Sequence, residues 1–342
     1  MSVSSSRVAE VRARLQALPR ERFAHLPTPL DHCPRLSADL GGTQIWIKRD
    51  DCTGLAFGGN KARQLEFVLG DAIAQGADVV IQGAASQSNH SRQLAAAAAR
   101  VGLDSVIVPR RDVMFEQGGG NQLVTRLLAG RLDPVPAAEW VTAAKAAIAD
   151  QLRRSGRRPY VVGMGAERAL TLAAVAYVEA LCEIVCAFED RGEPLPTHIY
   201  TTSQGSTQAG LQLGAVLLGL DISVVGINPM DETNEAYIPE RGIADLVSAA
   251  AGALGYSDVT PGPVVNDTSY VGPAYGMPSE ASREAIELLA RREGLLVDPI
   301  YSGKGFAGLL DHVRTGLRGP DDRVVFVHTG GLPALFAEFG DG

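Results

Sequence analysis

The sequence predicts an α/β protein with two domains, each an open, mostly parallel and twisted sheet covered by helices. Short apolar runs of strand length alternate with longer segments of helical periodicity from residue 44 onward. This alternation is typical of parallel sheets, because each parallel pair of strands needs a crossover helix. A break at Pro194-Leu195-Pro196 divides the series into two runs, which predicts two sheets with a cleft between them.

The N-terminal half opens with a helix and an extended segment. Apolar residues recur at helical spacing over 7–18, which predicts a surface helix, and two prolines keep residues 26–30 extended. A looser stretch at Gly118-Gly119-Gly120 interrupts the series that follows. That series is expected to contain strands at 44–48, 78–82, 104–108 and 159–162, and helices at 61–75, 90–101, 121–129, 137–154 and 167–189.

The C-terminal half repeats this pattern around one long connection. Residues 261–278 are rich in glycine, proline and tyrosine, which predicts a long functional loop. The other elements are expected as strands at 197–202, 222–227 and 323–328, and as helices at 207–219, 232–254, 279–293, 304–317 and from residue 333.

Charge and composition narrow the range of partners. Thirty-one basic and thirty-nine acidic residues give a net charge of −8, which argues against nucleic acid or an anionic membrane as a partner. Residues 1–23 lack the apolar core of a signal peptide and no apolar run reaches membrane-spanning length, so we expect a cytoplasmic protein. Cys182 and Cys186 lie one helical turn apart. We expect core thiols there and no metal site, because no histidine or further cysteine is near them in sequence.

Lys61 lies where an amine is easily deprotonated. It follows a glycine pair and begins an amphipathic helix, so an ammonium group there would face the positive end of the helix dipole. The repulsion favours the neutral amine, which is the form that makes a Schiff base. The alternative is a solvated lysine on the first turn of a helix. Arg63, two residues later, is expected to pair with Glu66 or Asp50 on the surface.

A second stretch of interest, Thr201 to Gly210, lies between a strand and a helix. Its small and hydroxyl residues free several backbone N–H groups to point at one anion, helped by the dipole of the following helix. The stretch lacks the ending of a Walker loop and the spacing of a dinucleotide fingerprint. It predicts a phosphate cup without a lysine of its own, or else a plain turn capped by Ser206 or Thr207.

Polar residues also follow the strand at 78–82, at the end where α/β proteins bind ligands. Ser88, Asn89 and His90 offer hydroxyl, amide and imidazole groups to a carboxylate or a ring oxygen. The alternative is a polar helix cap in which only one residue matters.

Two tyrosines and a threonine complete the candidate set. Tyr275 and Tyr301 lie in glycine-rich stretches and are either half-buried structure or proton donors aimed into the cleft, and Thr329 follows the last strand. A lysine suited to Schiff-base formation, a phosphate cup without a lysine and polar strand ends without a metal cluster fit pyridoxal phosphate. This cofactor forms a Schiff base with lysine and acts as an electron sink.

Five stretches carry a resemblance to a known family. Leu55–Arg63, Gln87–Arg92, Gly205–Gly210, Asp298–Lys304 and His328–Ala334 resemble the D-cysteine desulfhydrase / 1-aminocyclopropane-1-carboxylate deaminase family, which includes L-cysteate sulfo-lyases. The resemblance runs in order along almost the whole chain. It implies the tryptophan-synthase-β-like (type II) pyridoxal phosphate fold and a homodimer that acts on a small amino acid. We expect residues 58–170 to form a smaller domain at the cofactor cleft, and residues 1–57 with 171–342 a larger domain that binds the cofactor.

The resemblance also implies a role for each candidate residue. The cofactor is expected to contact Lys61 as Schiff-base lysine, Asn89 at the ring hydroxyl, Gln204, Gly205, Ser206 and Thr207 at the phosphate, and Thr329 at the ring nitrogen. The substrate is expected to contact Ser88, Asn89 and His90 through its carboxylate and Tyr275 and Tyr301 on its flanks. Lys61, Ser88, Tyr275 and Tyr301 are the expected catalytic residues.

Two departures from the family pattern bear on the substrate. By the resemblance, Ser302 stands where the deaminase has a glutamate, so we expect the hydroxyl of Thr329 to face the ring nitrogen, which would then be less readily protonated. The weaker electron sink suits loss of a good leaving group after the Cα proton, and aminocyclopropane carboxylate has no such proton. Glu167 and Arg168 replace small residues. Arg168 either offers a fork to a second anionic group such as a sulfonate or is a solvated arginine at a helix start.

The leading interpretation is a pyridoxal phosphate lyase. It would convert D-cysteine, L-cysteate or a similar β-substituted amino acid by α,β-elimination to pyruvate, ammonia and the leaving group. The alternatives are a 1-aminocyclopropane-1-carboxylate deaminase, a racemase or synthase of the same fold, and a binding protein that kept the fold but lost turnover. The presence of Lys61, Ser88 and both tyrosines argues against the last.

Overall fold

The computed structural model describes residues 3–136, 140–234 and 236–338. Its strands are β1 (Leu30–His32), β2 (Gln44–Lys48), β3 (Val79–Ala84), β4 (Asp104–Pro109), β5 (Arg131–Leu132), β6 (Pro159–Val161), β7 (His198–Thr202), β8 (Ser223–Ile227), β9 (Val265–Asp267) and β10 (Arg323–Val327). Its α-helices are α1 (Val3–Gln16), α2 (Pro34–Asp39), α3 (Asn60–Ala74), α4 (Asn89–Val101), α5 (Val113–Gln117), α6 (Gly120–Leu128), α7 (Val141–Arg154), α8 (Glu167–Arg191), α9 (Ser206–Leu218), α10 (Glu240–Ala253), α11 (Glu280–Glu293), α12 (Ser302–Arg314) and α13 (Leu332–Glu338). Two short 3₁₀ helices, η1 (Asp50–Thr53) and η2 (Leu55–Phe57), precede α3.

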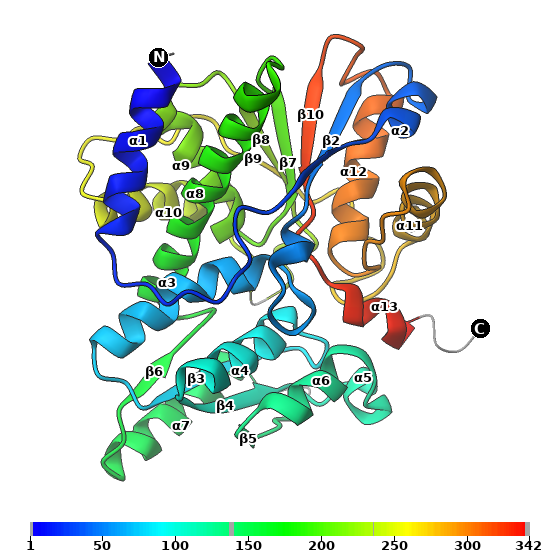
Figure 1. The fold of residues 1–342 in the computed structure, drawn as a ribbon. Helices are drawn as coiled ribbons and strands as arrows, with labels where there is room; N and C mark the ends of the chain where they lie inside the picture. The colour runs from blue at the N-terminus through cyan, green and yellow to red at the C-terminus, as the bar shows by residue number, and fades with distance from the viewer. Residues whose placement is uncertain (1–2, 137–139, 235, 339–342) are drawn as a thin grey trace.

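These elements form two sheets, one above the other in Figure 1. The larger sheet has six strands in the order β1-β2-β10-β7-β8-β9, and the smaller has four in the order β5-β4-β3-β6. Among these named strands every pair is parallel except β1 with β2. The α/β class with two mostly parallel sheets is therefore confirmed.

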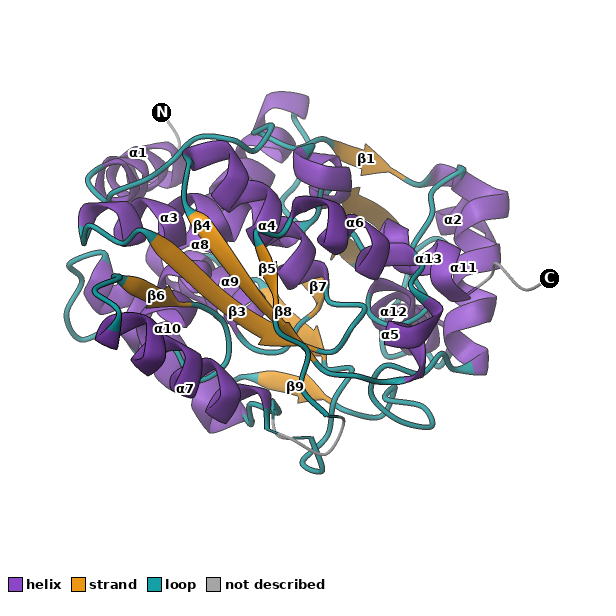
Figure 2. Ribbon diagram, turned by 90° about the horizontal axis from the view of Figure 1, so that it is seen from below, coloured by secondary structure: helices purple, strands orange, loops and turns teal. Residues whose placement is uncertain are grey.

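Helices cover both sheets on both faces. Helices α8, α9 and α10 lie on one side of the larger sheet, and α2, α11 and α12 on the other (Figure 1). In the smaller sheet, α4 and α7 pack on opposite faces (Figure 2). The β3 and β4 strands beneath them are almost wholly buried, as expected for parallel strands covered twice.

Most expected elements occur within a few residues of their predicted bounds, but some predictions were wrong. The helix expected over 232–254 begins only at Glu240, because Pro239 ends the turns before it and serves as its N-cap. Strand β9 lies inside the loop expected at 261–278. Part of the helix expected at 137–154, residues 137–139, lies outside the described residues. The short elements that the sequence did not indicate are β1, α2, η1, η2, α5 and β5.

Helix α8 lies at the centre of the main hydrophobic core. It packs against α3, α9, α10 and α1. Gly210 and Gly214 of α9 permit the close approach, because a Cβ at these positions would lie 2.0 Å from the Ala174 carbonyl oxygen or 2.8 Å from Leu181. Contrary to the expectation from sequence, α8 is long and apolar enough to cross a membrane, but 78% of that apolar segment is buried inside the protein. Its apolar surface is therefore used by the core.

A buried ion network joins α3 to α8 and η1. Arg63 pairs with Asp50, one of its two expected partners, but the guanidinium is fully buried and not on the surface. It donates to Asp50 at 3.0 and 3.2 Å and to Glu183 of α8 at 2.7 and 2.9 Å. Burial alone would raise the pKa of Asp50, but Arg63, Lys48 and the Tyr177 hydroxyl more than offset it and lower the pKa to about 2.

We expect Arg63→Met to lower the free energy of unfolding by about 3–5 kcal/mol, because two buried carboxylates lose their main partner. Denaturant unfolding measures the change. Arg153→Met, which breaks an exposed pair with Asp150, is the control and should shift the midpoint little. Equal shifts of the unfolding midpoint in the two variants would contradict a stabilising role for Arg63 in the buried network.

The difference in free energy of unfolding between wild type and Arg63→Met should depend on pH. The pKa of Asp50 is lowered in the folded protein from its ordinary 3.8 to about 2, so its contribution is fully present above the ordinary value and is lost as the pH falls toward 2. The difference between wild type and Arg63→Met should therefore shrink across that window.

Candidate active site

A cavity of about 450 Å³ lies between the two sheets, at the carboxyl ends of their parallel strands. The chain reaches it directly after β3, β4, β7 and β10 and at the starts of α3 and α12. The expected site residues in its lining are Lys61, Ser88, Asn89, His90, Gln204, Ser206, Thr207, Tyr275, Tyr301 and Thr329. Gly205 is not part of the lining. It is the N-cap of α9 with φ +125°, and a Cβ there would come within 3.0 Å of Ile238.

Lys61 is the one lysine of the chain that a ligand can reach. The other three, Lys48, Lys145 and Lys304, are each at most 1% exposed and donate to carbonyl or carboxylate oxygens. Lys61 is the second residue of α3 and is partly exposed on the cavity wall. Burial lowers the pKa of its amine from 10.5 to about 8. The neutral fraction near neutral pH is therefore far larger than for an ordinary lysine, and the neutral amine is the form that acts as a nucleophile.

The first turn of α9 supplies hydrogen-bond donors to the same cavity. The Thr207 hydroxyl accepts from the side-chain amides of Asn60 and Gln64, both at 3.2 Å, and the Ser206 hydroxyl accepts from Gln64 at 3.3 Å. Because each hydroxyl already accepts, its proton is available to donate to an anion. With the N–H groups of a helix N-terminus, these hydroxyls form a cup suited to a phosphate.

This donor set fits pyridoxal phosphate. The cup offers N–H and O–H groups to a phosphate, and the reachable amine is that of Lys61. Asp112 is the one acidic side chain among the described lining residues, and it accepts from the Ser86 hydroxyl at 2.5 Å. A dianionic group in the cup would therefore meet donors and no carboxylate.

Gln204 turns its side chain to the two tyrosines. Its amide donates to the Tyr301 hydroxyl, and the Tyr275 and Tyr301 hydroxyls are hydrogen-bonded to each other. The two rings are perpendicular, with centroids 5.8 Å apart. Burial raises the pKa of both hydroxyls, so they stay protonated and able to donate. Gln204, expected at the phosphate, can offer that group only its backbone N–H while its amide is engaged in this way.

Three polar side chains at the start of α4 differ in their interactions. Ser88 is the N-cap of α4 and accepts from the Ser91 N–H at 3.2 Å, as the helix-cap alternative predicts. The side-chain oxygen of Asn89, Oδ1, already accepts hydrogen bonds from Arg92 and Asn121, which leaves the side-chain NH₂ group for a ligand. Burial and then the charge of Lys61 hold the pKa of His90 well below its ordinary value, so this imidazole is neutral.

Arg92 organises this part of the site, a role that the sequence did not reveal. It is fully buried and donates to the side-chain oxygens of Asn89 at 3.1 Å and of Asn121 at 2.6 Å. It also donates to the backbone carbonyls of Ala56 and Gly58. The φ angles of +44° at Ala56 and +69° at Phe57 mark a strained turn before α3. The only signal in the sequence was its place one helical turn after Asn89.

The two departures at Ser302 and Arg168 lie outside the cavity lining. The buried Ser302 hydroxyl donates to the Asp298 carboxylate at 2.5 Å and lies 3.0 Å from the Gly330 carbonyl oxygen, while Thr329 lines the cavity. Arg168 donates to Asp71 at 2.8 Å, away from the lining residues. The geometry thus favours the alternative of a surface arginine. Among the described lining residues Arg110 is the one arginine, and nothing in the sequence indicated that it would lie there.

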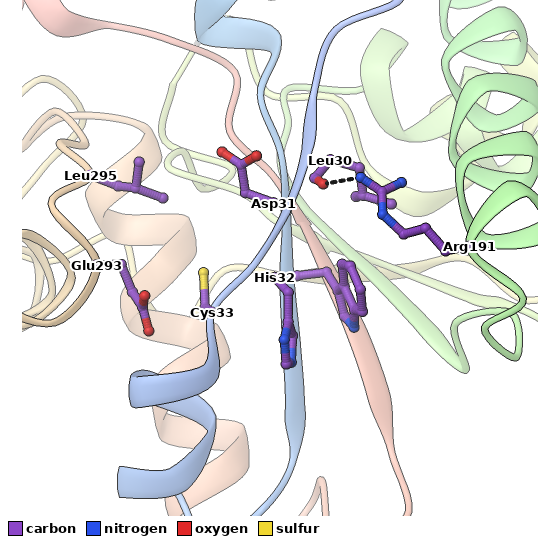
Figure 3. Close-up of a pocket in the computed structure, with 8 residues that line it drawn as sticks. Leu30, Asp31, His32, Cys33, Arg191, Glu293 and Leu295 are labelled. Atoms are coloured by element: carbon purple, nitrogen blue, oxygen red, sulfur yellow. Dashed lines mark hydrogen bonds between the residues drawn. The ribbon is translucent and has the colours of Figure 1, made fainter.

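A second hollow, of about 510 Å³, lies beside β1, the edge strand of the larger sheet (Figure 3). Its charged side chains already have protein partners. Asp31 pairs with Arg49 at 2.8 Å, Glu293 accepts from the Leu36 N–H at 2.7 Å, and Arg191 donates to the Leu30 carbonyl at 2.9 Å. The hollow contains no lysine, so the cavity at Lys61 is the candidate active site.

Comparison with known proteins gives consistent results. The family described as pyridoxal-phosphate dependent enzyme matches residues 22–330. D-cysteine desulfhydrases of Salmonella typhimurium and Salmonella typhi are each 37% identical over 327 residues, which is 94% of this chain and 97% of theirs. A solved structure of an ACC deaminase homologue is 33% identical, covers 97% of both chains and has a TM-score of 0.84. The apo diaminopropionate ammonia lyase of Escherichia coli shares the fold with a TM-score of 0.66 at 15% identity.

We expect borohydride reduction in the presence of pyridoxal phosphate to attach the cofactor to Lys61, because this amine is reachable and its pKa is lowered. Peptide mapping by mass spectrometry identifies the modified residue. The three buried lysines are internal controls and should remain unmodified. Lys61→Ala should abolish the adduct; a mapped adduct on Lys48, Lys145 or Lys304 would contradict the assignment.

Proposed function

This chain belongs to the pyridoxal-phosphate dependent enzymes, and on that premise we propose that it is a lyase that eliminates the β-substituent of a small amino acid. D-cysteine is the first substrate to test, because the curated relatives at 37% identity are D-cysteine desulfhydrases. Cysteine and water would yield pyruvate, ammonia and hydrogen sulfide. The observation that carries the proposal is one cavity that combines a reachable amine of lowered pKa, an anion cup and a hydrogen-bonded tyrosine pair.

The cup positions the cofactor in this proposal. Ser206 and Thr207 bind the phosphate through their hydroxyl and N–H groups, and Asn60 and Gln64 orient those hydroxyls. When bound, pyridoxal phosphate supplies an aldehyde for the substrate's amino group and an electron sink for its Cα. The NH₂ group of Asn89 is held by Arg92 in a fixed orientation and donates to the ring oxygen.

The proton transfers are assigned to Lys61 and the tyrosines. The neutral amine of Lys61 takes the Cα proton, which its lowered pKa of about 8 allows near neutral pH. Ser88 and His90 at the start of α4 hold the substrate carboxylate. Tyr275 and Tyr301 stay protonated and donate to the departing β-substituent. The hydroxyl of Thr329 would hold the ring nitrogen, since Thr329 lines the cavity and the Ser302 hydroxyl is bonded to Asp298.

We also propose a domain division and an assembly. Residues 58–170, which contain all four strands of the smaller sheet, form the smaller domain, and residues 1–57 with 171–342 the larger. The chain is proposed to act in the cytoplasm as a homodimer without membrane contact. Exposed apolar side chains on two adjacent helices support a contact between copies: Leu123 and Leu127 on α6 and Phe336 on α13.

We expect D-cysteine or L-cysteate to give pyruvate with a specificity constant at least tenfold above that for 2-oxobutyrate formation from aminocyclopropane carboxylate. The physical reason is the Cα proton, which Lys61 can remove from the first two compounds and which the third lacks. Pyruvate, 2-oxobutyrate, sulfide and sulfite are measured side by side with both enantiomers of cysteine and cysteate. The reverse ranking would put the deaminase first, and no keto acid from any of them would reject the proposed lyase.

The homodimer predicts a solution mass twice the 36.0 kDa of the chain. Leu127→Glu combined with Phe336→Glu should shift the mass toward the monomer, because two charges would be buried between the copies. Leu317→Glu, at an exposed apolar residue elsewhere, is the control. A monomeric wild type in light scattering would reject the assembly.

A further inference from the structure

Lys304 is a buried cation that the proposed reaction does not use. It lies one turn into α12, three residues after Tyr301, and it is fully buried. Its ammonium group donates to the carbonyl oxygens of Val271 at 2.6 Å and Ala274 at 3.1 Å. Burying an ammonium group is costly, and burial lowers the pKa of Lys304 to about 8 even though Asp298 opposes the shift.

Both carbonyls belong to the connection 268–279 between β9 and α11, which carries Tyr275. This connection contains no strand or helix, and two prolines in it lack an N–H group. Its described backbone hydrogen bonds are few and local, such as Met277 N–H to Ala274 at 3.2 Å. A long connection of this kind needs anchors from outside to keep one conformation.

The same end of α12 therefore contacts the connection at two places. Tyr301, the N-cap of α12, meets the Tyr275 hydroxyl, and Lys304 one turn later holds the carbonyl directly before Tyr275. The second contact fixes the backbone, and the first joins the side chains. We propose that Lys304 is a positioning residue that holds the Tyr275 hydroxyl in place against Tyr301 and Gln204.

The part of this inference that concerns catalysis rests on the proposed function, because only that proposal makes Tyr275 a proton donor. The part that concerns the backbone does not depend on any reaction. Lys145 provides a matched comparison: it is also buried and donates to the carbonyls of Val162 and Met164, two residues of the cavity lining, at 3.1 and 2.6 Å.

Hydrogen–deuterium exchange tests the hold on the backbone without any activity assay. We expect Lys304→Met to speed amide exchange in peptides covering 268–279 by about tenfold or more, and to leave 201–208 unchanged. Lys145→Met, the same change at the other buried lysine, should act on 162–164 and spare 268–279. Unchanged exchange at 268–279 in Lys304→Met would overturn the proposal.

Tyr275→Phe covers the case in which Lys304→Met does not fold. This variant removes the hydroxyl contact and leaves Lys304 in place, so exchange over 268–279 should stay within about twofold of wild type. If Tyr275→Phe alone releases the connection, the hydroxyl pair is the anchor and the proposal is wrong.

A double-mutant cycle tests the catalytic part. Lys304→Met should lower kcat about tenfold with a much smaller change in KM, and Tyr275→Phe should lower kcat at least as much. If Lys304 acts through Tyr275, the double variant should be no slower than Tyr275→Phe within about twofold. Multiplying effects would show an independent role and overturn the proposal. An inactive wild type would reject the proposed function, while the exchange experiment would still decide the structural hold.

Discussion

The site depends on lowering the pKa of one amine within a helix turn that also holds a buried cation. Lys61 and Arg63 are two residues apart on α3, yet their pKa values shift in opposite directions. Burial lowers the pKa of Lys61, whereas Asp50 and Glu183 raise the pKa of Arg63 well above its ordinary value, against the effect of burial. The difference comes from partners. Arg63 is enclosed by Asp50 and Glu183, whereas the described residues provide no carboxylate for Lys61. A carboxylate beside Lys61 would restore its charge and remove the nucleophile.

The rest of the architecture brings groups to that amine. Parallel strands end at the same edge of a sheet, so β3, β7 and β10 deliver the start of α4, the anion cup and Thr329 to one cavity. Two buried cations then fix the irregular segments: Arg92 holds the strained turn before α3, and Lys304 holds the connection that carries Tyr275. The strands and helices thus bring the reacting groups together. Buried side chains that donate to backbone carbonyl groups then hold the reacting groups in a fixed orientation.

Local patterns were enough to predict most strands, most helices and the residues at the strand ends. Strand β2 occurs over the predicted residues 44–48, because a run of alternating and apolar residues there is typical of a strand. The sequence could not place Arg63, because its partner Glu183 is 120 residues away along the chain. Nor could it assign Lys304, whose acceptors are backbone carbonyl groups that any residue possesses, or Arg92, which donates to such groups as well as to Asn89 and Asn121. Strand β9 was missed because it has only three residues, and it is a strand only through its pairing with β8.

The pKa of the Lys61 amine in the cofactor-free protein tests this account most directly. The rate at which an acylating reagent modifies Lys61 can be followed against pH by mass spectrometry of its peptide, with the three buried lysines as internal comparison. The account predicts a half-maximal rate near pH 8. A half-maximal rate near the ordinary 10.5 would show that the pKa of the amine is not lowered, and would contradict the claim that burial without a carboxylate partner prepares Lys61 for its reaction.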